Sequence, residues 1–182
     1  SLGLVGSEMC IRDSSKAELF VIHNSDKFEF KFLSTHNGLN YLSEEFINSN
    51  NIYSDWSELS GSPHIELARW ADEIIIYPAS ANLISKISSG IADDLLTSTI
   101  LMFSKPIYIC PAMHEEMYMN SQIQSNVLNL SKNHYIVGPR YGNLDIGDKG
   151  LGRLIEPDEL LGVINKQKGK IIVTSGPVSY TH

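Results

Sequence analysis

The chain has 182 residues, of which 42% are hydrophobic and 19% are charged, and its formal net charge is −7. This composition fits one globular domain with a sizeable core and argues against a disordered chain. The negative balance argues against a general electrostatic grip on nucleic acid or on an anionic membrane. A local anion site is still compatible with it, because backbone N–H groups at a helix N-terminus bind phosphate without an excess of Lys or Arg.

The sequence contains two cysteines, Cys10 and Cys110. Two cysteines are too few for a disulfide framework, and neither has metal-ligand spacing to a histidine. No apolar run approaches the roughly 20 residues of a membrane-spanning helix. We therefore expect a cytoplasmic protein with no metal site and no membrane partner.

The two ends of the sequence resemble translated adapter sequence. We set aside residues 1–13 as a foreign head and residues 178–182 as a foreign tail. On this interpretation the natural protein continues beyond both ends, and its first strand and phosphate loop are missing here. The alternative is a natural, irregular head and tail.

Segments typical of strands and helices alternate along the rest of the chain. Apolar runs, or apolar and polar residues in alternation, predict strands at 28–33, 73–77, 106–110, 135–137 and 170–174. Apolar residues at helical spacing predict helical or amphipathic segments at 16–24, 39–47, 64–71, 83–89, 92–103, 121–132 and 157–165. Loops are expected at 48–63 and at the glycine-rich 138–152. This order predicts an α/β fold, a doubly wound, mostly parallel sheet in a three-layer Rossmann-like domain.

Polar turns follow two of the predicted strands directly, after Tyr77 and after Cys110. Ligands of doubly wound sheets bind beyond the carboxyl ends of the strands. We therefore expect the functional site at this edge of the sheet.

Five motifs in fixed order carry a family resemblance. They are His64–Asp72, Pro78–Asn82, Gly90–Leu95, Pro111–Met117 and Gly147–Arg153. Together they resemble the homo-oligomeric flavin-containing cysteine decarboxylases, and most closely the decarboxylase half of the bifunctional phosphopantothenoylcysteine decarboxylase and synthetase. The segment Lys170–Pro177 resembles the first strand and glycine turn of the synthetase half. The resemblance implies a decarboxylase domain at 14–166 and the start of a synthetase domain at 167–177.

The turn that follows Tyr77 has the small side chains that let backbone amides approach a flat ring or a phosphate. By resemblance it binds FMN, and the implied cofactor residues are Thr35, Ser80, Ala81, Asn82, Leu83 and Ala112. An ordinary helix cap at Ser80 or Asn82 is the structural alternative for this turn. A turn-forming role is the alternative for Thr35.

His64 opens a predicted helix after a Gly-Ser-Pro turn. The partial positive charge of a helix N-terminus disfavours the protonated imidazole, and a neutral imidazole can act as a base. The resemblance implies that His64 helps to deprotonate the substrate and lies across a subunit contact from the neighbouring flavin. A purely structural histidine is the alternative.

The resemblance also implies substrate contacts by His114, Met117, Asp148 and Arg153. Two positions depart from the family pattern. His114 stands where many members carry an Asn that binds the substrate carboxylate; it could replace that Asn as a donor or simply cap the following helix. Ile146 stands where many members carry a proton-donating Cys. Isoleucine cannot donate a proton, so the route of the final proton is open.

The implied reaction is FMN-dependent decarboxylation of 4'-phosphopantothenoylcysteine to 4'-phosphopantetheine in coenzyme A biosynthesis, with the cofactor supplying the redox chemistry. The implied partners are further copies of the chain, as a homotrimer or dodecamer, and a covalently fused synthetase domain. Two alternatives are a peptidyl-cysteine decarboxylase and a non-catalytic, FMN-binding regulatory flavoprotein. If the two ends are foreign and the first strand and phosphate loop are missing, we expect weak flavin binding, and weak or no activity, from this chain alone.

Overall fold

The structure, a computed structural model, describes residues 5–58, 61–144, 148–164 and 168–175. Its centre is a six-stranded sheet in the order β2-β1-β8-β3-β4-β5, and every neighbouring pair of strands is parallel. The strands of this sheet are β1 (Phe28–Ser34), β2 (Ile52–Tyr53), β3 (Glu73–Ala79), β4 (Tyr108–Pro111), β5 (Tyr135–Ile136) and β8 (Gly169–Ser175). The predicted α/β fold with a parallel sheet is confirmed.

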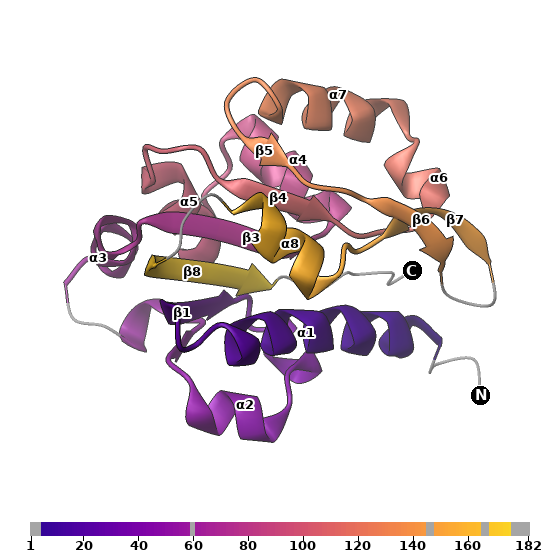
Figure 1. Cartoon of the computed structure of the whole chain (residues 1–182). Helices are drawn as coiled ribbons and strands as arrows, with labels where there is room; N and C mark the ends of the chain where they lie inside the picture. The colour runs from indigo at the N-terminus through magenta and orange to yellow at the C-terminus, as the bar shows by residue number, and fades with distance from the viewer. Residues whose placement is uncertain (1–4, 59–60, 145–147, 165–167, 176–182) are drawn as a thin grey trace.

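Helices connect these strands and cover both faces of the sheet (Figure 1). They are α1 (Val5–His23), α2 (Glu44–Ser49), α3 (Pro63–Trp70), α4 (Ala81–Ser89), α5 (Leu95–Met102), α6 (Glu115–Tyr118), α7 (Ser121–Leu130) and α8 (Pro157–Val163). Two short 3-10 helices, η1 (Gly38–Tyr41) and η2 (Trp56–Glu58), complete the set among the described residues. Helix α1 begins inside the segment that the sequence led us to set aside as foreign.

The core has two halves, one on each face of the sheet. On one face, residues of α1, α2 and α8 such as Phe20, Phe46 and Leu160 pack against β1, β3 and β8. On the other face, residues of α3, α4, α5 and α7, such as Leu67 and Ile84, pack against the same strands. Burial of this apolar surface from both sides is the main favourable contribution to the stability of a three-layer domain.

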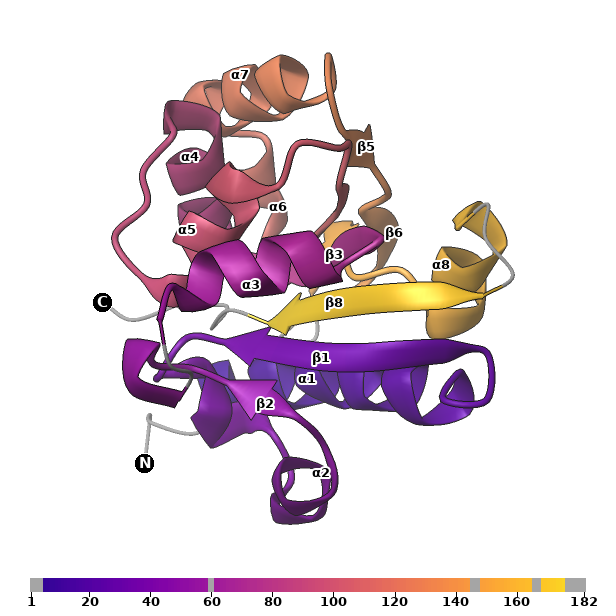
Figure 2. The same ribbon diagram turned by 90° about the vertical axis from the view of Figure 1, so that its left-hand side faces the viewer.

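One of the two central strands of the sheet comes from the end of the described chain. β8 pairs with β1 from Phe28↔Gly169 to Ser34↔Ser175, and it pairs with β3 from Glu73↔Ile171 to Ile76↔Thr174. Figure 2 shows β8 lying between α3 and β1 in that view, parallel to β1. Residues 171–174 are all buried, as a strand covered on both faces requires. The segment that resembles the start of a synthetase domain is thus a strand of the same sheet here. The proposed boundary after residue 166 stays a prediction.

The structure differs from the sequence prediction at several places, among them the expected loop 48–63, which contains β2 and η2. Residues 39–47 contain two short helical pieces, η1 and the start of α2. Helix α5 begins three residues later than predicted, because Asp94 caps it by accepting a hydrogen bond from the backbone N–H of Thr97 at 2.7 Å. The glycine-rich stretch expected to be a loop forms an antiparallel hairpin of β6 (Arg140–Asn143) and β7 (Lys149–Arg153).

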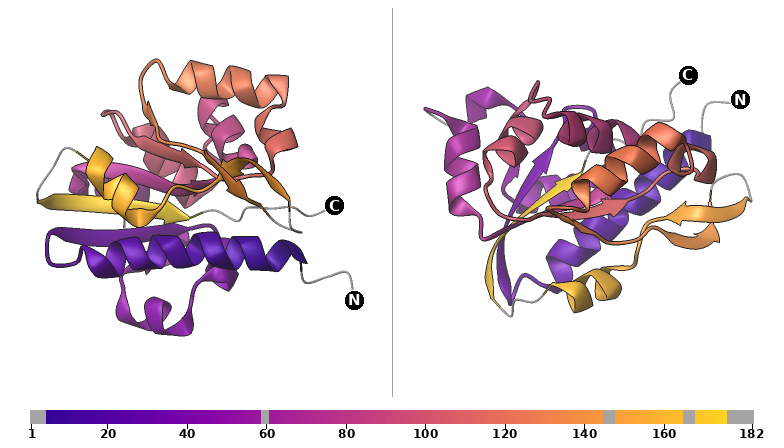
Figure 3. Two further views of the ribbon diagram at one scale, coloured as in Figure 1. Left: turned by 45° about the vertical axis from the view of Figure 1, so that its right-hand side comes forward. Right: turned by 90° about the horizontal axis from the view of Figure 1, so that it is seen from above.

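This hairpin is separate from the main sheet and projects from one end of the molecule, as the orange strands in Figure 3 show. In the described part of the chain, no helix is long and apolar enough to cross a membrane.

Candidate functional site

A pocket of about 230 Å³ lies at the carboxyl ends of β1 and β3. Thr35 follows the last residue of β1, and Ser80 follows the last residue of β3. The lining residues are Thr35, Asn37, Ser80, Asn82, Leu83, Lys86 and Asp94. Four of the six cofactor residues that the sequence predicted therefore meet in one pocket, although β8 separates their two strands.

Ser80 lies between the last residue of β3 and the first residue of α4. Its backbone is extended (φ −73°, ψ 161°), and its hydroxyl oxygen accepts a hydrogen bond from the backbone N–H of Leu83 at 3.2 Å. This is the N-cap that the sequence offered as the structural alternative. The two interpretations are compatible, because the cap places the N-terminus of the nine-residue helix α4 at the pocket.

Thr35 has a comparable double role. Its hydroxyl oxygen accepts a hydrogen bond from the backbone N–H of Gly38 at 3.1 Å, which closes the turn into η1. The same residue lines the pocket. The turn therefore fixes the direction of the threonine side chain at the end of β1.

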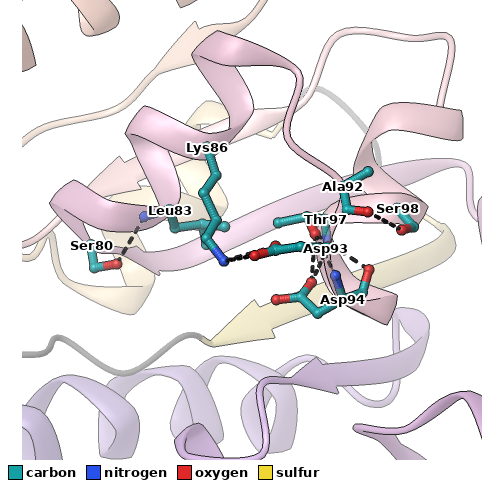
Figure 4. A network of polar contacts seen from close by, with 8 residues as sticks. All are labelled: Ser80, Leu83, Lys86, Ala92, Asp93, Asp94, Thr97 and Ser98. Carbon is teal, nitrogen blue, oxygen red and sulfur yellow. Dashed lines mark hydrogen bonds and ion pairs between the residues drawn. The ribbon is translucent and has the colours of Figure 1, made fainter.

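The far wall of the pocket is a charged network between α4 and α5 (Figure 4). The Lys86 ammonium donates to both carboxylate oxygens of Asp93 at 2.8 Å, and this interaction lowers the pKa of the Asp93 carboxyl. Asp94 accepts from the hydroxyl of Thr97 at 2.6 Å. Lys86, Asn37 and Asp94 were not predicted as site residues from the sequence. The signal available was the Gly90–Leu95 motif, which contains Asp93 and Asp94.

The two remaining cofactor candidates, Ala81 and Ala112, are buried in the core. The backbone N–H of Ala112 donates to the carbonyl of Ala79 at 3.1 Å, which holds the end of β4 beside the end of β3. Neither alanine is among the residues that line the pocket.

His64 lies in the first turn of α3, directly after Pro63. Its imidazole contacts the indole of Trp56 edge to face, with ring centroids 5.3 Å apart and ring planes at 74°. Its Nδ1 atom is buried and has no hydrogen-bond partner among the described residues. His64 does not line the pocket formed by this chain.

The predicted substrate residues gather around α6 and the hairpin. His114 is the residue before α6, and its Nδ1 lies 3.8 Å from a carboxylate oxygen of Glu116. Met117 is partly buried against the core. Because α6 follows the end of β4, this second group lies at the same edge of the sheet as the pocket.

Arg153 ends β7, and its Nη1 atom lies 3.6 Å from Glu156. Its Nε atom is buried without a hydrogen-bond partner in the part of the chain that the structure describes. Asp148 is exposed and lies directly before β7. Ile146, the departure in the flap, lies outside the described residues.

Comparison with known proteins identifies the family of this chain. The model of the Flavoprotein family matches residues 13–169. The chain belongs to this family. The matched range ends at the first residue of β8, so the family domain contributes five of the six strands and the following segment contributes β8.

The chain is similar to the coenzyme A biosynthesis bifunctional protein CoaBC of Vibrio vulnificus, with 39% identity over 122 residues. This match covers 63% of the chain and 30% of the relative, so the chain spans less than a third of the relative's length.

Two solved structures show the same fold. A PPC (phosphopantothenoylcysteine) decarboxylase variant complexed with pantothenoylaminoethenethiol has a TM-score of 0.78 at 28% identity, covering 84% of this chain and 90% of that one. The FMN-binding protein AtHal3 has a TM-score of 0.66 at 26% identity, covering 76% of this chain and 94% of that one.

The lining of the pocket offers groups that an organic cofactor can contact. The pocket combines hydroxyl and amide groups, one apolar side chain, the charged Lys86 and Asp94 side chains, and a helix N-terminus. Among the side chains that the structure describes, no group of three or more His, Cys, Asp or Glu is placed to hold a metal ion. A flavin cofactor follows from membership of the Flavoprotein family.

Proposed function

We propose that the protein catalyses the FMN-dependent decarboxylation of 4'-phosphopantothenoylcysteine to 4'-phosphopantetheine. One observation carries the proposal: in a member of the Flavoprotein family, Thr35 and the turn Ser80–Leu83 meet in a pocket at the carboxyl edge of the sheet. The relatives support the choice of substrate, because they include CoaBC and a PPC decarboxylase.

The residues of the pocket fit FMN. Leu83 offers an apolar contact for the flat ring, and Thr35, Ser80 and Asn82 offer hydroxyl and amide groups for its polar edge and for the ribityl chain. The N-terminus of α4 favours an anion, such as the phosphate of FMN. A volume of about 230 Å³ is below the roughly 300–1,000 Å³ of complete ligand pockets, so it would enclose part of the cofactor.

When bound, FMN supplies a reversible two-electron oxidation of the thiol-bearing part of the substrate, which makes loss of carbon dioxide possible. We assign to His64 the removal of the thiol proton. Because Nδ1 of His64 is buried, we assign acceptance of the thiol proton to Nε2. Because His64 does not line this chain's own pocket, we infer that it serves the site of a neighbouring subunit in a homotrimer or dodecamer.

Binding of the substrate falls to the group around α6 and the hairpin. We assign recognition of the substrate carboxylate to His114, whose ring can donate a hydrogen bond where the family often has an Asn. Arg153 has a buried Nε donor that no described group satisfies, and such a donor suits an anionic or carbonyl oxygen of the substrate. Met117 and Asp148 complete the proposed contacts.

The cellular compartment and the fused domain are also part of the proposed function. We propose a cytoplasmic protein fused to a synthetase domain, in agreement with the name of its bifunctional relative. Burial raises the pKa of the Cys110 thiol, and a buried free thiol agrees with a reducing compartment.

The test incubates the purified chain with saturating FMN and 4'-phosphopantothenoylcysteine and measures the release of carbon dioxide. We expect release with this substrate and at least tenfold less from the His64→Asn variant, in line with the usual contribution of a general base of roughly 10²–10⁴. FMN binding without release from any substrate would overturn the proposal in favour of a regulatory flavoprotein. Release from a peptide ending in cysteine, and not from phosphopantothenoylcysteine, would support the peptidyl-cysteine alternative.

A further inference from the structure

The β6–β7 hairpin is held to the domain by the segment that follows β4. The backbone N–H of Met113 donates to the carbonyl of Gly152 at 3.1 Å. Two residues later, the Glu115 carboxylate accepts a hydrogen bond from the backbone N–H of Leu151 at 3.1 Å. These two bonds join consecutive residues of β7 to the turn that carries His114.

The glycines of β7 make this contact close. A Cβ atom at Gly152 would overlap the carbonyl oxygen of Met113, and one at Gly150 would lie 2.7 Å from a carboxylate oxygen of Glu115. At Gly152 the close neighbour is backbone, so only glycine leaves room there. At Gly150 the absence of a side chain leaves space for the Glu115 carboxylate.

Among the described residues, two ion pairs also link the hairpin to the start of α8: Arg140 with Glu159 at 3.2 Å and Arg153 with Glu156 at 3.6 Å, all with partly exposed side chains. Tyr141 is exposed, and the hairpin belongs to a separate two-stranded sheet, a kind of element that is marginally stable by itself in water. Its buried apolar residue is Leu144, which lies next to Gly150 and Gly152. A hydrogen bond to a carboxylate is stronger than one between neutral groups, so the Glu115 contact contributes strongly to holding the hairpin against the domain.

We propose that Glu115 is a positioning residue that fixes the hairpin against the His114 turn and so sets the places of Asp148 and Arg153. The role of the hairpin as a substrate flap rests on the proposed function. The placement of the hairpin by Glu115 does not. Glu115 acts through the backbone of Leu151 and need not touch the substrate.

The first test measures amide hydrogen exchange by NMR on the full chain. In Glu115→Ala we expect the Leu151 amide to exchange roughly tenfold faster, since about one net hydrogen bond is lost, while the Ile75 amide in the core keeps its rate. Glu115→Gln keeps an acceptor oxygen and should restore most of the protection. Glu45→Gln, on the exposed start of α2, is the matched control and should change neither amide.

An unchanged Leu151 rate in Glu115→Ala would overturn the proposal, and so would an equal acceleration at Ile75, because that result indicates a general loss of stability. The second test measures turnover of phosphopantothenoylcysteine with saturating FMN. We expect Glu115→Ala to raise KM several-fold with kcat within about twofold, and Glu115→Gln to rescue KM, as for a lost binding placement. A fall in kcat with KM unchanged would contradict this. If the wild-type chain releases no carbon dioxide, the proposed function fails, and the exchange of Leu151 still decides the role of Glu115.

Discussion

Asp72 and Lys170 form two hydrogen bonds to each other across 98 residues of sequence. The Asp72 carboxylate accepts from the backbone N–H of Lys170 at 3.0 Å, and the backbone N–H of Asp72 donates to the carbonyl of Lys170 at 2.8 Å. This pair aligns the start of β8 with the start of β3, and it sets the register in which β8 enters the sheet.

We expect Asp72→Ala to lower the free energy of unfolding by about 1 kcal/mol, because one hydrogen bond to the start of β8 is lost. Asp72→Asn keeps an acceptor oxygen and should lose less. Urea denaturation followed by circular dichroism measures both. Equal stabilities for the alanine variant and the wild type would mean that the side chain does not hold the strand.

Ile172 tests whether β8 lies in the centre of the sheet. It is fully buried between Lys31 of β1 and Ile74 of β3. We expect Ile172→Ala to cost about 2–5 kcal/mol and Ile172→Val about 0.5–1.5 kcal/mol, because a cavity in a packed core adds to the lost transfer energy. Leu128→Ala is the control, because the Leu128 side chain is 67% exposed. An Ile172→Ala variant as stable as this control would contradict the central position.

Two substitutions of Ser80 distinguish its role as a helix N-cap from its proposed contact with FMN. Ser80→Ala should lose about 1 kcal/mol of stability through the missing N-cap. Ser80→Asp keeps a good N-cap and should stay within about 0.5 kcal/mol of the wild type. The added charge should weaken FMN binding roughly tenfold or more, because it faces an anionic cofactor. Flavin fluorescence titration checks the affinity, and unchanged FMN affinity in Ser80→Asp would place the phosphate elsewhere.

Glu159 makes a contribution to stability that depends on pH. The backbone N–H of Glu156, which donates to its carboxylate at 3.1 Å, is the main cause that lowers the pKa of Glu159 below its usual 4.5. A depressed pKa in the folded state stabilises the fold above pH 4.5, and this contribution is lost as the pH falls through the folded value. Glu159→Gln should therefore be less stable than the wild type at pH 6, and this difference should be smaller at an acidic pH below the folded pKa. Urea midpoints at the two pH values measure this, and a difference of the same size at low pH would assign it to packing.

Cys110 should be unreactive in the native protein. It is fully buried, and desolvation raises the pKa of its thiol, so the nucleophilic thiolate is scarce. In a Cys10→Ser background, we expect a thiol reagent such as iodoacetamide to label Cys110 only in denaturant. Rapid labelling under native conditions would show that the end of β4 opens to solvent.

The sequence by itself determined the class of fold and the edge of the sheet at which the candidate site lies. Apolar runs such as residues 73–77 are typical of buried parallel strands, and the polar turns after them must meet at one edge because the strands run the same way. The family resemblance implied Thr35 and Ser80 as cofactor residues, and the structure brings both to one pocket.

The tertiary structure decided what depends on contacts between distant segments. The centre of the sheet is taken by β8, and its neighbour β3 lies about a hundred residues earlier, so no local pattern could reveal the pairing. The hairpin was not predicted, because its glycines are typical of loops. The reason for small residues at 150 and 152 is their contact with Met113 and Glu115, which only the tertiary structure shows. Lys86 and Asp94 join the pocket for the same reason: the packing of α4 against α5, and not their own sequence context, brings them to its wall.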